Sequence, residues 1–146
     1  MGNSEKAIEE FEKAHSMIPA CEEPLKYLSK LHYKNKNFID ASHFFEMYAD
    51  VKPDSPEALL YASVSYKMCK EFSKAADLGE RFYLRCPNHL KNLINLADIY
   101  KNMGIRDKTL ELIEKILVLD PDNDFAMQVT RLLEKNELGD FAAKGK

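Results

Sequence analysis

Alternating aspartates near the C-terminus form the pattern in this chain that comes nearest to a metal site. Asp120, Asp122 and Asp124 stand at every second position, as carboxylate ligands do at the start of a calcium-binding loop. The sixth position of such a loop requires glycine, but this chain has Phe125 there, and Arg131 replaces the closing glutamate. We therefore interpret the aspartates as turn formers and as the N-cap of a following helix, and we expect no metal site.

The histidines and cysteines are scattered, and they predict neither catalysis nor a cofactor. His32 and His43 would form a metal pair if neighbouring helices brought them together, but a core imidazole is the favoured interpretation of His32. Cys21, Cys69 and Cys86 are widely spaced and have no C-x-x-C motif, which predicts free thiols in a reducing, cytoplasmic compartment. The sequence also has no glycine-rich phosphate loop, nucleophile elbow or H-E-x-x-H motif, so we expect a protein that is not an enzyme.

Charge and hydropathy disfavour two classes of partner. The 146 residues carry a net charge of −3, which provides no general attraction to nucleic acid or to anionic membranes. No apolar run approaches the roughly 20 residues that cross a bilayer, so we expect no membrane insertion. Apolar residues make up 45% and charged residues 31% of the chain, with only five glycines and six prolines, which indicates a folded, helix-rich protein.

The elements that position these residues follow an internal repeat. Pro19, Pro53, Pro87 and Pro121 recur at one constant interval, a period of about 34 residues, which is typical of two-helix repeats. Each proline ends an amphipathic, helix-like pattern and precedes a polar turn, and proline cannot continue a helix. Four such stops in one register predict a repeating unit of two helices.

Other residue types keep the same spacing. Small residues recur at two positions, and leucines and ring residues recur at one position each. The members are Ala7, Ala41, Ala75 and Thr109; Ser29, Ser63 and Ala97; Leu25, Leu59 and Leu93; and His32, Tyr66 and Tyr100. Two helices that cross closely need small side chains at the crossing, so we expect the small residues to lie there.

This pattern resembles the tetratricopeptide repeat (TPR) family, whose unit has the same length. One complete unit matches the family pattern through Leu59, Ala62, Ser63, Tyr66, Ala75 and Pro87. The resemblance extends over residues 2 to about 136. It implies an all-α, right-handed α-solenoid of helix-turn-helix repeats.

We expect one repeat array across residues 1–146. Because the chain begins in phase with the middle of a unit, we also expect it to be a fragment of a longer protein. The array would comprise one half unit, three full units and a C-terminal helix. Their bounds are 2–21 for the half repeat, 22–55, 56–89 and 90–123 for the repeats, 124–137 for a capping helix and 138–146 for a polar tail.

Two second helices depart from the family pattern of phenylalanine followed by alanine. One has Gly79 and then Phe82, which we interpret as a size swap in which the ring fills the space left by the glycine. The other has two large rings, Phe45 and Tyr48, and must pack differently.

In TPR arrays the first helices line a concave groove that holds a peptide, and the resemblance implies the binding residues of this chain. We expect an apolar centre of Tyr27, Leu60, Tyr61, Val64 and Ile94 and a basic rim of Lys30, Lys34, Lys67 and Lys101. The apolar residues occupy positions that repeat packing does not need, and the lysines would contact acidic residues of a partner. Two plainer interpretations stay open: the apolar residues pack on the adjacent helix, and the lysines form only a solvated helix face.

One class of ligand is disfavoured. Chaperone-binding TPR domains hold a terminal carboxylate with a lysine and an asparagine, then an asparagine, then a lysine and an arginine, on successive first helices. The matching residues here are Lys26, Lys30, Tyr61, Lys91 and Asn95, so only the two lysines at positions 26 and 91 agree.

We therefore predict a non-catalytic scaffold that binds a peptide or protein segment in the concave groove. One alternative is a recruitment module of a larger enzyme or regulator. Another is a scaffold that self-assembles through the apolar face of an exposed N-terminal helix, residues 4–17. Nucleic-acid binding is disfavoured because the chain is acidic and lacks regularly placed base-contacting pairs.

Overall fold

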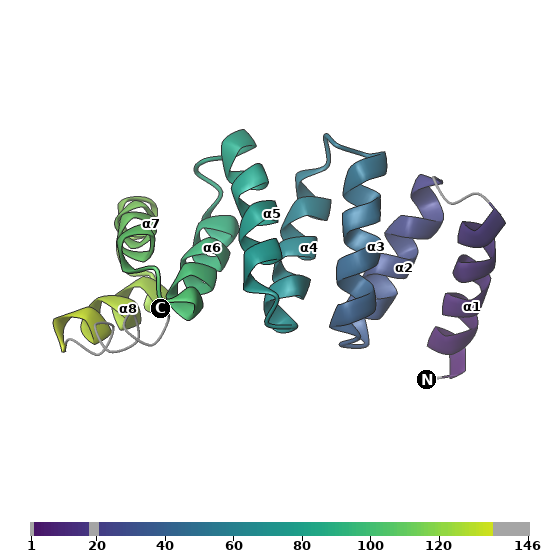
Figure 1. Ribbon diagram of the computed structural model, residues 1–146, viewed down its shortest axis with the longest axis horizontal. Helices are drawn as coiled ribbons and strands as arrows, with labels where there is room; N and C mark the ends of the chain where they lie inside the picture. Colours follow the sequence, from purple (N-terminus) through teal and green to yellow (C-terminus); the bar gives the residue numbers. More distant parts are fainter. Residues whose placement is uncertain (1, 18–20, 136–146) are drawn as a thin grey trace. The chain divides into compact units, whose positions relative to one another are not determined.

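The computed structural model describes residues 2–17 and 21–135, which form eight helices and no strand. In chain order (Figure 1) they are α1 Gly2–Met17, α2 Glu22–Lys34, α3 Phe38–Val51, α4 Pro56–Met68, α5 Phe72–Arg85, α6 Leu90–Met103, α7 Arg106–Leu119 and α8 Asp124–Glu134. The prediction of an all-α protein built from successive helix-turn-helix pairs is confirmed. Pro19 and the predicted polar tail 138–146 lie outside the described residues.

The helix boundaries repeat with the period of the prolines. The even-numbered helices begin at residues 22, 56, 90 and 124, and α3, α5 and α7 end at residues 51, 85 and 119. Pro53, Pro87 and Pro121 lie in the turns that follow α3, α5 and α7, where the spacing of the prolines predicted the helices to stop.

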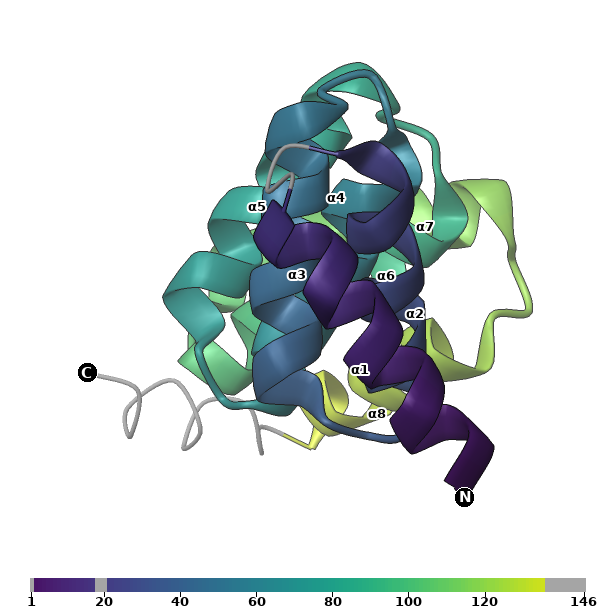
Figure 2. The ribbon, with the colours of Figure 1, turned by 90° about the vertical axis from the view of Figure 1, so that its right-hand side faces the viewer.

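The described helices divide into two units, Met1–Glu71 with α1 to α4 (unit 1) and Phe72–Lys146 with α5 to α8 (unit 2). In unit 1, α1 packs on α2, α2 on α3 and α3 on α4, and α1 lies at the front of Figure 2. In unit 2, α5 packs on α6, α6 on α7 and α7 on α8. The predicted repeat 56–89 thus contributes α4 to unit 1 and α5 to unit 2.

Of the small residues expected at helix crossings, all but the half-buried Ala7 are buried. Each of Ser29, Ala41, Ser63, Ala75, Ala97 and Thr109 is at most 1% exposed. The hydroxyl groups of Ser29 and Thr109 donate hydrogen bonds to backbone carbonyls one helical turn earlier, so these buried polar groups are satisfied within their own helices.

The N-cap of α8 is an asparagine rather than one of the predicted aspartates. Asn123 Oδ1 accepts a hydrogen bond from the backbone N–H of Ala126 at 3.0 Å. Asp120 Oδ2 in turn accepts from Asn123 Nδ2 at 3.0 Å, so an aspartate orients the capping side chain. The expectation of turn-forming aspartates thus holds at Asp120, whereas the cap itself was assigned to the wrong residue type.

The turn between the two helices of a pair repeats as well. Lys36, Lys70 and Gly104 occupy equivalent positions in successive repeats, and their φ angles are 62°, 63° and 77°. This left-handed region suits glycine, whereas a side chain there crowds the backbone. Two of these turns therefore hold a lysine in a conformation that favours glycine.

At the recurring ring position, two tyrosines each donate a hydrogen bond to a glutamate on the preceding helix. The Tyr100 hydroxyl on α6 donates to Glu80 Oε1 on α5 at 2.5 Å, and the Tyr66 hydroxyl on α4 donates to Glu46 Oε1 on α3 at 3.3 Å. Both tyrosines are buried, and the two glutamates also occupy equivalent positions in successive repeats. Burial and the hydrogen bond from its hydroxyl to Glu80 hold the pKa of Tyr100 well above its ordinary range.

His32 occupies the same position but pairs differently. It is 5% exposed, as expected for a core imidazole, and it stacks on Phe44 with 5.4 Å between ring centroids. Its Nε2 lies 4.0 Å from Glu12 Oε1 and its Nδ1 lies 3.9 Å from Asp40 Oδ2, and neither nitrogen makes a hydrogen bond. His43 is exposed, so the structure gives the two histidines different surroundings.

Candidate functional site

Unit 1 contains a pocket of about 310 Å³ lined by α2, α3 and α4, which we name the aromatic pocket. Its lining residues are Lys30, Tyr33, Phe45, Glu57 and Tyr61. Lys30 and Tyr61 belong to the predicted groove, and the fold brings them together. Tyr33 and Phe45 were not predicted as residues of the site.

Three rings line the pocket. Phe45 on α3 stacks on Tyr61 of α4 at 5.4 Å between centroids. Tyr33 on α2 meets both rings edge-on, at 5.2 Å from Tyr61 and 6.2 Å from Phe45. These are favourable geometries for aromatic pairs, so the three rings support one another.

The stacked pair recurs one repeat earlier. Phe11 on α1 stacks on Tyr27 of α2 at 4.9 Å, and these two positions are equivalent to Phe45 and Tyr61 of the following repeat. Phe45 thus packs against the next first helix, a contact that the sequence pattern did not supply. Tyr27 remains 48% exposed, but its ring faces α1 and is not part of the aromatic pocket.

An ion pair stands at the rim of the aromatic pocket. Lys30 Nζ lies 3.8 Å from Glu57 Oε1, and both side chains are about half exposed. The pair leaves the pocket without net charge. Burial, with a smaller contribution from Tyr61, raises the pKa of Tyr33. The hydroxyl of this tyrosine therefore stays protonated more readily than that of a free tyrosine.

The remaining predicted residues of unit 1 have different environments. Leu60 is only 9% exposed and belongs to the core, so the expectation of an open apolar side chain is wrong for this residue. Leu60 follows Leu59 on α4, and both leucines are buried because helix packing covers more than one stripe of this helix. Val64 and Lys67 are half-buried, and Lys34 is exposed.

The predicted residues of unit 2 lie on α6. Ile94 is half-buried, and Lys101 Nζ lies 3.6 Å from Asp98 Oδ1 and 5.7 Å from the centre of the Phe125 ring. Of the predicted basic rim, Lys101 and Lys30 are thus balanced by carboxylates of the protein itself.

Unit 2 has a pocket of about 240 Å³ whose side chains are paired with one another. Lys108 Nζ lies 4.8 Å from the centre of the Tyr100 ring, and Lys115 Nζ lies 4.6 Å from that of Tyr83. Lys115 also donates a hydrogen bond to the Tyr83 hydroxyl, and Tyr100 donates to Glu80. These contacts join α5, α6 and α7.

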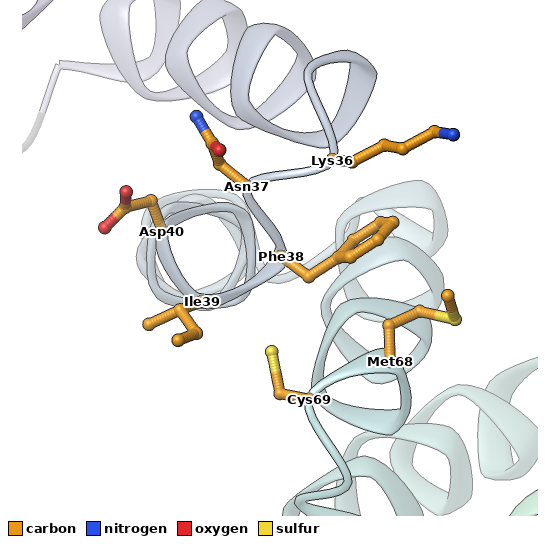
Figure 3. Close-up of a pocket in the computed structure, with 7 residues that line it drawn as sticks. All are labelled: Lys36, Asn37, Phe38, Ile39, Asp40, Met68 and Cys69. Carbon is orange, nitrogen blue, oxygen red and sulfur yellow. The ribbon is translucent and has the colours of Figure 1, made fainter.

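A further pocket of about 430 Å³, the turn pocket, lies in unit 1 between the start of α3 and the end of α4 (Figure 3). Its lining includes Lys36, Phe38, Ile39, Asp40, Met68 and Cys69. Ile39 is 67% and Met68 is 53% exposed, and both line this one pocket, so they gather apolar surface at one place. Burial, reinforced by the nearby Glu71 carboxylate, raises the pKa of the Cys69 thiol, which makes it a weaker nucleophile.

Two kinds of site are absent from the described part of the chain. Within residues 2–17 and 21–135, histidine, cysteine and acidic side chains do not gather in threes that could hold a metal ion. Each helix in these ranges is also too short or too polar to span a bilayer.

Comparison with known proteins places these features in a structural class. No protein-family model and no curated protein sequence matches this chain. A crystal structure of MamA matches 99% of this chain and 85% of its own, with a TM-score of 0.82 and 25% sequence identity. The TPR domain of Arabidopsis OM64 matches 79% of this chain and 95% of its own, with a TM-score of 0.72 and 16% identity.

The first TPR of Spaghetti (RPAP3), solved bound to the HSP90 peptide SRMEEVD, is also similar. It matches 76% of this chain and 88% of its own, with a TM-score of 0.71 and 17% identity. Helix order, the register of the repeats and these likenesses together show that this chain is a TPR-like, all-helical protein.

Proposed function

We propose that this chain is a non-catalytic scaffold that binds a peptide or protein segment through unit 1, on the face where α2 and α4 present the aromatic pocket. The cluster of rings around one pocket is the observation that carries the proposal. Tyr33 and Tyr61 are half-buried and line a pocket of about 310 Å³, which is at the lower end of the volumes that hold ligands. TPR folds are generally protein-interaction modules, and the RPAP3 domain holds a peptide.

The partner belongs to a different class from the HSP90 peptide of RPAP3. Of the five positions that would hold a terminal carboxylate, only Lys26 and Lys91 carry the expected residue type. Asn95 is also buried, 4% exposed, which makes it a poor contact for a ligand.

Selection from a displayed library of random peptides on the immobilised chain tests the proposal. We expect selected peptides to lose at least about tenfold in affinity on Tyr61→Ala, because a central aromatic anchor carries a large share of binding energy. Leu84→Ala is the control, since Leu84 lies in unit 2 and is 81% exposed. If neither Tyr61→Ala nor Lys30→Ala changes the affinity of the selected peptides, their binding site lies outside the aromatic pocket.

A further inference from the structure

We propose that unit 1 binds an extended segment through two large uncharged side chains, one in the aromatic pocket and one in the turn pocket. This inference rests on the proposed function and specifies the chemistry of the partner. It departs from the expectation of an acidic segment held by a basic rim.

The two pockets are neighbours. The ring of Tyr33, which lines the aromatic pocket, meets the ring of Phe38, which lines the turn pocket, at 5.6 Å between centroids. Helix α4 also contributes to both, through Tyr61 in the first pocket and Met68 in the second. One ligand can therefore contact both pockets along α4.

Each pocket is lined by one lysine and one acidic residue. These are Lys30 with Glu57 in the aromatic pocket and Lys36 with Asp40 in the turn pocket. Figure 3 shows Lys36 and Asp40 pointing away from the space between Phe38, Met68 and Cys69. A charged ligand side chain would lose hydration in either pocket and find no unbalanced opposite charge, so charge complementarity favours an uncharged one.

Apolar surface at the turn pocket supplies the attraction. Ile39 and Met68 are both more than half exposed, and covering them removes apolar surface from water. Methionine also adapts its shape to different ligand side chains. The turn pocket therefore accepts any of several large apolar residues.

The spacing of the two side chains follows from α4. Tyr61 and Met68 are seven residues apart, which corresponds to about 10 Å along a helix. A segment in the extended polyproline II conformation advances about 3.1 Å per residue with three residues per turn, so side chains at positions i and i+3 lie on the same side and match this separation. An extended backbone also keeps its N–H and C=O groups available to Glu57 and Lys30 at the rim.

The test uses a phage-displayed library of random dodecapeptides selected on the full chain. We expect enriched peptides to carry two residues from Phe, Trp, Leu, Met and Tyr at i and i+3, with little net charge. Synthetic copies of the best peptide should lose about tenfold in affinity on Tyr61→Ala and on Met68→Ala, and little on Leu84→Ala. Replacing a peptide anchor by alanine should lower the affinity less for the protein variant that lacks the matching pocket residue than for the wild-type protein.

Salt and charge give a second readout. The affinity of the uncharged peptide should change less than about twofold between low and high salt, because the peptide has no net charge whose attraction to the protein salt could screen. Enrichment of acidic or basic anchors, or a peptide that responds to Tyr61→Ala but ignores Met68→Ala, would overturn the two-pocket inference and leave the proposed function standing. Failure of the proposed function itself would appear as the absence of any peptide, charged or not, that responds to Tyr61→Ala.

Discussion

Asn92, in the first turn of α6, donates a side-chain hydrogen bond to the backbone carbonyl of Gly79 on α5 at 3.0 Å, and both residues are buried. Gly79 occupies the repeat position that Phe11 and Phe45 hold in unit 1. In unit 1 each phenylalanine stacks on a tyrosine of the next helix, whereas unit 2 has Asn95 in place of that tyrosine. The glycine thus permits a backbone contact where the earlier repeats stack two rings.

Gly79→Leu is expected to destabilise the protein by about 1–3 kcal/mol, because the new side chain overpacks the contact between α5 and α6. Asn92→Ala should cost about 1 kcal/mol through the lost hydrogen bond. Since both changes disrupt one contact, the double variant should lose less than the sum. Urea unfolding of the three variants measures these values, and unchanged stability of Gly79→Leu would refute the close approach.

The left-handed turn positions predict stabilising substitutions. Lys36→Gly and Lys70→Gly should each raise the free energy of unfolding by about 0.5–1 kcal/mol, because glycine removes the crowding at positive φ. Lys26→Gly is the matched control, since the same change inside α2 should lower stability by about 1 kcal/mol. Thermal melts would contradict this account if all three changes shifted the midpoint in the same direction.

Tyr100 predicts a loss of stability at alkaline pH. Its pKa in the folded state is raised by burial and by Glu80, so its contribution is fully present below the unfolded value of about 10 and is lost as pH rises further. Tyr100→Phe should therefore weaken the pH dependence of the free energy of unfolding above about pH 10. Identical curves of the free energy of unfolding against pH for wild type and Tyr100→Phe would contradict the prediction.

The stacked pair of His32 and Phe44 predicts a non-additive substitution. At the equivalent positions unit 2 has Tyr100 and Leu112, a larger first ring with a smaller neighbour. His32→Tyr alone should overpack against Phe44, whereas His32→Tyr with Phe44→Leu should allow the new hydroxyl to donate to Glu12, as Tyr100 does to Glu80. We expect the double variant to be at least about 1 kcal/mol more stable than the sum of its single changes implies, which denaturant unfolding would show.

The first helix should be the least protected in unit 1. Helix α1 packs mainly on α2, whereas α3 packs on both α2 and α4. Hydrogen exchange should thus be faster in α1 than in α3 at concentrations where sedimentation shows a monomer. Equally slow exchange in a monomer would contradict this, and protection of α1 that appears only with oligomers would support self-assembly through that helix.

Much of the fold could be predicted because it depends on local periodicity. The constant spacing of prolines located the ends of α3, α5 and α7, and the recurrent small residues located buried positions such as Ser29 and Ala97. These inferences succeed because a helix places residues three and four apart on one face, and because proline and side-chain size act within one or two turns.

The aromatic pocket could be predicted only in part. Periodicity placed Lys30 and Tyr61 on first helices, but it could not show that Phe45 reaches across from α3 or that Glu57 balances Lys30. These contacts join residues from three helices, and the rotation of each helix about its axis decides which neighbours meet.

Exposure of single residues was likewise a matter of tertiary structure. The sequence by itself determined the helices, their register and the class of fold. Packing decided that Leu60 is buried while Met68, two turns further along the same helix, is more than half exposed. The physical reason is that hydropathy is a property of the residue, whereas burial depends on which surfaces the neighbouring helices cover.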